Sequence, residues 1–200
     1  MNLPIVKISH SKMLDPYFIF YYQNHPEWKD KWIQPSEDEV ANRIKKYKEV
    51  WSEFEKYILQ GICDFFQLSF VETVIEVYVV SGNHRGFSNP LVISSKYNED
   101  ELLIILTHEL IHRLLEGNQI RIKKDYFPGL PVLTRNHIIV HAALKYIYID
   151  ILDRQDLLLL NKKQSEKSIS LGYPEYNIAW EIVEEKGYMN LKEGYKKSIS

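Results

Sequence analysis

The longest regular pattern of apolar and polar residues in the chain follows Ser36. From there, apolar residues recur in steps of three and four, which is the spacing of one face of a helix. The stripe consists of Val40, Ile44, Tyr47, Trp51, Phe54, Ile58 and Ile62. Charged residues of both signs occupy the other faces, so the pattern predicts a long amphipathic helix. Ser36 and Glu39 have the spacing of a capping box, which places the start of this helix at Ser36.

Two shorter segments have the composition of strands. β-branched residues dominate residues 70–80, and we expect a strand there. A second, shorter strand is expected at residues 91–94, immediately after Pro90. Because proline lacks a backbone N–H, its position indicates the start of a strand or the edge of a sheet. The chain therefore combines a long helix with a small sheet.

An almost wholly apolar segment follows the second strand. Asn98 and Glu101 again have capping-box spacing, and Gly117 is a natural C-terminal stop for a helix. Between them, apolar residues fall on nearly every helical face: Leu102, Leu103, Ile104, Ile105, Leu106, Leu110, Ile111, Leu114 and Leu115. A helix that is apolar all round is buried, so we expect a core helix over residues 98–117.

The segments around these elements are less regular. Residues 1–35 contain four prolines and many aromatic residues, and we expect an irregular N-terminal arm. Residues 123–133 are expected to form a loop, and residues 135–152 a helix capped by Thr134. The serine-rich residues 162–172 have the composition of a linker or flexible loop.

The C-terminal part of the chain is expected to contain one more helix. Proline favours the first turn of a helix, so Pro174 predicts a helix that ends near Gly187. The polar residues 192–200 are expected to fray. We divide the chain into an N-terminal arm (residues 1–35), a central domain (residues 36–160) and a C-terminal helical extension of the same domain (residues 161–200).

Composition narrows the possible function classes. The 200 residues are 45% hydrophobic and 26% charged, with a formal net charge of −2. This balance is typical of a globular protein and argues against a nucleic-acid partner. Cys63 is the only cysteine, which excludes an intramolecular disulfide and a cysteine-rich zinc site and fits a reducing compartment. No apolar run has the length of a signal peptide or a membrane span, so we expect a cytoplasmic protein with no membrane partner.

The core helix carries the residues with the clearest chemistry. His108, Glu109 and His112 form the pattern His-Glu-x-x-His. On a helix, residues four apart lie on the same face, so both imidazoles can bind one metal ion. Glu109 lies beside the pair, where its carboxylate can take a proton from a water molecule at the metal. The alternative, two hydrogen-bonded core histidines, leaves three buried polar side chains to be satisfied without a metal.

A catalytic zinc usually has three protein ligands, so a third ligand must come from elsewhere in the chain. His137 and His141 are again four residues apart, on the next predicted helix. We expect one of them to bind the metal and the other to form a hydrogen bond with a ligand, the substrate or a backbone carbonyl. A glutamate of the last helix is the alternative third ligand: Glu175, Glu181 or Glu184.

The segment from His108 to His112 resembles the active-site helix of the zincin metallopeptidases. Its spacing to the second histidine pair is similar to that of the gluzincin group, whose second helix carries Asn-Glu-x-x-x-Asp. Asn136, His137 and His141 stand in those three places, so histidine replaces both acids. The resemblance implies that His137 takes the place of the zinc-ligating glutamate, which gives three histidine ligands for Zn²⁺.

The same resemblance covers about residues 36–150 and implies an α+β fold of the zincin type. It would comprise a long N-terminal backing helix, a small twisted sheet, the buried active-site helix and a second ligand helix, and the expected C-terminal helix follows in the extension. The strand before the active-site helix would form the upper rim of the cleft, where an extended substrate can pair.

The implied activity is that of a zinc-dependent metallopeptidase, which hydrolyses a peptide bond of a peptide or protein substrate with Glu109 as general base. Candidate donors to the developing oxyanion are Tyr148, His84, Arg85, Arg135 and whichever histidine of the second pair does not bind the metal. Two alternatives are a metal-dependent amidase of a small substrate, and a non-catalytic zincin-fold module with a regulatory or binding role.

Overall fold

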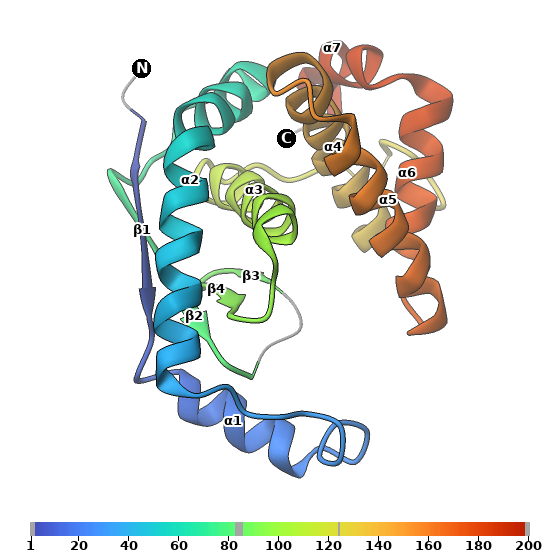
Figure 1. Cartoon of the computed structure of the whole chain (residues 1–200). Coiled ribbons are helices and arrows are strands. Elements are labelled where there is room, and N and C mark those ends of the chain that lie inside the picture. The colour runs from blue at the N-terminus through green and yellow to red at the C-terminus, as the bar shows by residue number, and fades with distance from the viewer. Residues whose placement is uncertain (1–2, 83–85, 124, 199–200) are drawn as a thin grey trace. The chain divides into compact units, whose positions relative to one another are not determined.

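A computed structural model describes residues 3–82, 86–123 and 125–198, which form a mixed α+β structure (Figure 1). The strands are β1 (Ile5–His10), β2 (Val74–Val80), β3 (Phe87–Ser88) and β4 (Leu91–Ser94). The helices are α1 (Asp15–Asn24), α2 (Glu37–Phe66), α3 (Glu99–Gly117), α4 (Val132–Tyr146), α5 (Gln155–Ser170), α6 (Glu175–Lys186) and α7 (Tyr188–Ser198). A π-helical segment, η1 (Ile147–Ile151), continues α4. The expected α+β class is therefore confirmed.

These elements form two compact units. The first, which we name the sheet unit, contains residues 3–56 and 72–110. It holds the four strands of the described chain together with α1 and the first parts of α2 and α3. The second, which we name the helical unit, contains residues 57–71 and 111–198 and holds the ends of α2 and α3 with all the later elements.

The sheet has the strand order β1-β2-β4-β3. β1 pairs in parallel with β2, with Ile5 opposite Val74, and β2 pairs in parallel with β4. Val77 and Val79 are fully buried, as expected for parallel strands rich in β-branched residues. β3 is antiparallel to β4 and lies at the edge of the sheet. The segment 91–94, which the resemblance placed at the rim, is therefore an inner strand, and β3 takes the edge.

Both predicted capping boxes are present. Ser36 donates to Glu39 Oε2 from its backbone N–H (2.7 Å) and its hydroxyl (2.9 Å), and Glu39 N donates to Ser36 Oγ at 3.2 Å. Glu101 N donates to Asn98 Oδ1 at 2.9 Å, and Asn98 N donates to Glu101 Oε2 at 3.0 Å. α3 ends at Gly117, also as predicted. Both helices therefore begin where side chains satisfy their first backbone N–H groups.

The apolar stripe of α2 faces the core as expected. Its buried members are Val40, Ile44, Tyr47, Trp51, Ile58 and Ile62. The hydroxyl of Tyr47 lies 2.8 Å from the carbonyl oxygens of both Ser94 and Tyr97. Because Ser94 ends β4 and Tyr97 precedes α3, this contact fixes the segment that leads into the core helix.

The prediction that residues 1–35 are irregular is wrong, because they contain β1 and α1. β1 is held by parallel pairing with β2, a contact between segments far apart in the sequence that no local pattern reveals. Its Val6 and Ile8 are buried, and the backbone N–H of Val6 donates to Glu55 of α2 at 3.1 Å. Pro16 lies in the first turn of α1, where a missing N–H costs no helical hydrogen bond.

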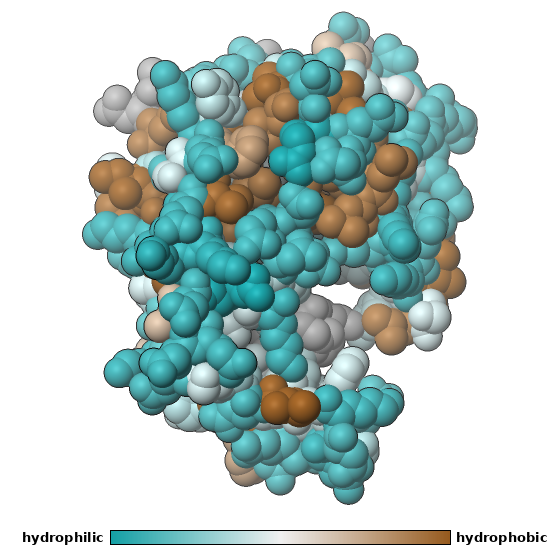
Figure 2. Space-filling model, in the orientation of Figure 1, coloured by the Kyte–Doolittle hydropathy of each residue, from teal (hydrophilic) through white to brown (hydrophobic). Residues whose placement is uncertain are grey.

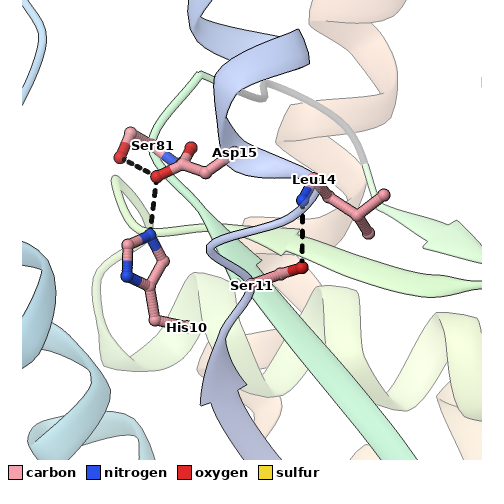
Figure 3. A network of polar contacts seen from close by, with 5 residues as sticks. All are labelled: His10, Ser11, Leu14, Asp15 and Ser81. Atoms are coloured by element: carbon pink, nitrogen blue, oxygen red, sulfur yellow. Dashed lines mark hydrogen bonds and ion pairs between the residues drawn. The ribbon is translucent and has the colours of Figure 1, made fainter.

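A polar network joins α1 to the ends of β1 and β2 (Figure 3). His10 Nε2 lies 2.6 Å from Asp15 Oδ2, and the Ser81 hydroxyl donates to the same oxygen at 2.7 Å. The Ser81 backbone N–H donates to Asp15 Oδ1 at 2.5 Å. Beside it, Leu14 N donates to Ser11 Oγ at 3.2 Å. These partners explain why a carboxylate is tolerated at the buried position of Asp15.

The prediction of a linker at residues 162–172 is wrong, because these residues lie mostly within α5. Residues 192–198 of the polar tail belong to α7, and their fraying stays a prediction. The polar character of α5 misled the prediction, because Asn161 and Ser165 belong to its buried face. Trp180 Nε1 of α6 donates to Asn161 Oδ1 at 3.1 Å, which satisfies that buried amide.

Some boundaries also differ from the predicted ones. Thr134 lies inside α4, whose N-cap is Pro131, so it is not the capping residue. The expected helix over residues 135–152 ends at Tyr146 as an α-helix and continues as η1. β2 begins at Val74, several residues later than predicted. The last predicted helix is confirmed, since α6 lies between Pro174 and Gly187.

Hydrophilic residues cover much of the face seen in Figure 2, with hydrophobic residues exposed between them. α2, the longest helix of the described residues, is strongly amphipathic. Across the described chain, no helix combines the length and the apolarity needed to cross a membrane.

Candidate metal centre

Three histidines from two helices come together at one place. α3 carries His108 and His112 one turn apart on the same face, and α4 carries His137. Each histidine offers one ring nitrogen, and these three nitrogens lie within 4.8 Å of one another. His108 and His112 are partly exposed, whereas His137 is buried. Three imidazole nitrogens at this separation can hold one metal ion.

His137 is oriented by a hydrogen bond within its own helix. Its Nδ1 lies 2.8 Å from the carbonyl oxygen of Leu133, which can only accept a hydrogen bond, so Nδ1 carries the proton. The lone pair is then on Nε2, which is the nitrogen available to a metal. Metal-binding histidines usually have such a carbonyl or carboxylate partner on the other ring nitrogen.

Burial keeps His112 and His137 neutral. Burial, together with the proximity of His137, lowers the pKa of His112 to about 3. Burial lowers the pKa of His137 to about 4, against the opposing effect of the Leu133 carbonyl and of Glu175. Because the rings of His112 and His137 meet edge to face with centroids 5.1 Å apart, two positive charges there would repel each other. Neutral imidazole is the form that binds metals, so the donor set fits a metal ion.

His141 lies outside the group of three nitrogens. Its ring centroid is 5.6 Å from that of His137, and its ring is stacked on Trp180 at 4.5 Å with an interplanar angle of 16°. It is 1% exposed, and burial lowers its pKa well below the usual value. His137 therefore lies close to His108 and His112. His141 instead packs against Trp180 of α6.

Sequence reasoning did not single out Tyr176. Its ring meets that of His137 edge to face, with centroids 4.5 Å apart. Tyr176 and Trp180 are four residues apart on α6, as His137 and His141 are on α4. This equal spacing in the sequence could have indicated that α4 and α6 pack against each other. In the structure it gives two ring contacts one helical turn apart, His137 with Tyr176 and His141 with Trp180.

The three glutamates considered as alternative ligands differ in their surroundings. Glu175 raises the pKa of His137, and its Oε2 is buried with no hydrogen-bond partner among the described residues. Glu181 accepts a hydrogen bond from Asn177 at 2.8 Å, and Glu184 pairs with two lysines at 2.7 Å each. Of the three, Glu175 is the one whose charge acts on the histidine group.

Glu109 follows His108 on α3, and its side chain is buried away from solvent. Its side chain is only 8% exposed, and burial raises its pKa to about 7. The backbone of Gly86 approaches it so closely that a Cβ at position 86 would lie 2.5 Å from Glu109 Oε1 and 2.8 Å from Ile105 Cγ2. Only glycine fits there without displacing the carboxylate.

In metal-free protein, Glu109→Gln should raise the free energy of unfolding at pH 8 by about 3 kcal/mol and leave it nearly unchanged at pH 4. The pKa of Glu109 is about 7 in the folded protein against a usual 4.5. The stability contributed by its neutral form is therefore complete below pH 4.5 and is lost as the pH rises through 7. Glutamine stays neutral throughout. Urea unfolding in the presence of a chelator measures the free energy of unfolding of both proteins at each pH. An equal increase at pH 4 and pH 8 would show that burial of the Glu109 charge is not the cause of the stabilisation.

The candidate oxyanion donors are only partly described. Tyr148 lies in η1 with its side chain fully buried, and its hydroxyl has no hydrogen-bond partner among the described residues. Burial raises its pKa. Arg135 is buried in α4 and donates from Nη1 to the carbonyl oxygen of Leu130 at 3.2 Å. His84 and Arg85 lie outside the described residues. The oxyanion role stays a prediction for all four.

Compared with known proteins, the chain matches no protein-family model, no curated protein and no solved structure. The functional interpretation therefore depends on the chemistry of the chain's own residues. These are the three clustered histidines and the buried glutamate between two of them in the sequence.

Proposed function

We propose that this protein is a zinc-dependent metallopeptidase. The observation that carries the proposal is the group of three histidine nitrogens within 4.8 Å, together with the buried carboxylate of Glu109 on the same helix as two of them. Histidine ligands suit Zn²⁺, and three protein ligands are the number found at catalytic zinc sites, which keep one position for water.

His108, His112 and His137 would hold the metal. A zinc ion bound there supplies a water molecule of lowered pKa and an electrophile that polarises a carbonyl group. Glu109 would take a proton from the attacking water as its oxygen bonds to the carbonyl carbon, and would return that proton to the leaving nitrogen as the C–N bond breaks. In the metal-free protein, burial raises the pKa of Glu109 to about 7, so its carboxylate takes up a proton more readily than an exposed one.

The position of Gly86 and β3 favours an extended peptide as the substrate. Gly86 touches the Glu109 side chain and immediately precedes β3, the edge strand of the sheet. An edge strand offers unpaired backbone groups, and an extended peptide can bind by adding a strand to it. A peptide aligned in this way would pass beside the general base, which favours a peptide or protein over a small amide as substrate.

The proposal is tested first by metal analysis of the purified protein and by digestion of a peptide library. We expect about one zinc per chain, since the histidine group offers a single site. Peptide cleavage should stop on chelation and return with zinc. Zinc with hydrolysis only of small amides would favour the amidase alternative. A metal-free protein that cleaves nothing would favour the non-catalytic module and refute the proposal.

Gly86→Ala should lower the rate of peptide hydrolysis by about a hundredfold while zinc content stays unchanged, because a displaced general base loses its alignment with the reacting water. The added methyl group would occupy the space of the Glu109 carboxylate. The measurement is kcat and KM on one peptide beside the zinc content of the same preparation.

Gly61→Ala is the matched control. It makes the same chemical change in α2, where the new methyl group would meet only Ile151 and Ile147 side chains at 3.3 and 3.4 Å. It should leave hydrolysis close to that of the wild type. Full activity in Gly86→Ala would show that the position of Glu109 does not depend on this close approach.

A further inference from the structure

A second candidate site lies in the sheet unit, at the first turns of α2. A cavity of about 370 Å³ opens between this part of α2 and the segment that follows β4. Its polar lining comprises Glu39, Asn42, Arg43, Lys46, Ser95 and Lys96. A cavity of this size matches a small ligand rather than a flat protein interface.

The lining is strongly positive. Three of its side chains are cations, and its single carboxylate, Glu39, is held by the two hydrogen bonds from Ser36 in the capping box. Arg43 pairs with Glu99 at 3.5 Å. In the part of the chain that the structure describes, neither Lys46 nor Lys96 has a carboxylate partner. Two lysines that line one cavity without a carboxylate partner leave it with positive charge, which a bound anion would neutralise.

The segment that carries Ser95 and Lys96 is held in place. Tyr47 binds the carbonyl oxygens of Ser94 and Tyr97 on either side of it, at 2.8 Å each. The Lys96 ammonium group lies 5.3 Å from the ring centre of Trp32, and burial lowers its pKa. A site whose backbone is already fixed loses little entropy when a ligand binds.

Ser95 adds a neutral group to this lining. Its side chain is 7% exposed, and its hydroxyl has no hydrogen-bond partner among the described residues. A buried hydroxyl without a partner carries a desolvation cost that an acceptor oxygen would remove. Phosphate offers several acceptor oxygens and up to two negative charges, which suits a cavity lined by a buried hydroxyl and two lysines.

We infer that this cavity binds the phosphate group of a small phosphate ester. Lys46 and Lys96 supply the charge, Arg43 a further donor, and Ser95 the neutral hydrogen bond. The first turns of α2 and α3 also carry carboxylates, namely Glu37, Asp38, Glu99, Asp100 and Glu101. Negative charge on the helices that adjoin the lining segments disfavours a long polyanion such as a nucleic acid. The inference does not depend on the metal centre or on peptidase activity.

The test is calorimetric titration of the zinc-free and the zinc-loaded full chain with inorganic phosphate and with ribose 5-phosphate. Both should bind, and ribose 5-phosphate should bind more tightly because the cavity is larger than phosphate alone. Lys96→Ala and Lys46→Ala should each weaken binding about tenfold, and Ser95→Ala about threefold without any change of charge.

Lys45→Ala is the control, since Lys45 is an exposed neighbour on α2 that pairs with Glu49 at 4.0 Å. It should leave both affinities unchanged. The inference is overturned if neither phosphate compound binds at millimolar concentration, or if Lys45→Ala weakens binding as much as Lys96→Ala. It is also overturned if a single-stranded oligonucleotide displaces ribose 5-phosphate at a lower concentration.

Discussion

His137→Ala should leave the purified protein without bound zinc, whereas His141→Ala should only weaken zinc binding about ten- to a hundredfold. The two residues are one turn apart on α4, but only His137 places a ring nitrogen within 4.8 Å of those of His108 and His112. Removing it leaves two ligands from one helix. His141 acts on the site through packing, with its ring 5.6 Å from that of His137 and stacked on Trp180.

Zinc content after dialysis against graded concentrations of a chelator measures both effects. His25→Ala serves as a control, because this partly exposed histidine lies just after α1, outside the three-histidine group. If His141→Ala empties the site and His137→Ala does not, the ligand assignment is reversed. If neither change alters zinc content, Glu175 becomes the first residue to test as third ligand.

Glu109→Gln should lower the rate of peptide hydrolysis by a factor of about a hundred to ten thousand while zinc content stays near that of the wild type. Glutamine keeps the size of the side chain and a hydrogen-bonding group, but it cannot take a proton from water. Because Glu109 is not one of the three clustered nitrogen donors, metal binding should not depend on it.

Turnover of one peptide and the zinc content of the same sample are the measurements. Glu53→Gln is a suitable control, since it makes the same change at an exposed position of α2, outside the three-histidine group. Wild-type turnover in Glu109→Gln would exclude Glu109 as the base. Loss of zinc in this variant would instead show that the carboxylate helps to hold the metal.

The sequence predicted best what local interactions determine. α3 begins at a capping box and ends at a glycine, and both signals lie within a few residues of the helix ends they mark. The pairing of His108 with His112 needs only a helix. β1 was missed because its stability comes from parallel pairing with a strand that lies far away in the sequence. α5 was missed because its buried face includes the polar residues Asn161 and Ser165, of which Asn161 accepts a hydrogen bond from Trp180 of α6 and Ser165 donates to a carbonyl of α5 itself.

Within the candidate site, too, the sequence predicted local features but not contacts between distant segments. The spacing of His137 and His141 identified both as candidates, but a helix alone cannot decide which of two residues one turn apart points to a distant partner. The ring contacts of Tyr176 and Trp180 depend on how α6 packs against α4, which no local pattern encodes. The pKa of Glu109 is likewise set by burial in the folded protein.

The division of the ligands between two helices has a consequence for the order of folding. α3 has its own start and stop signals, so it can form early and carry two ligands in place before the rest of the chain is complete. His137 arrives only when α4 packs beside it, and during synthesis it leaves the ribosome 25 residues after His112, a delay of a few seconds. Full coordination therefore becomes possible only once this non-local contact exists, so a metal ion held by all three histidines would mark the completion of the fold and would not initiate it.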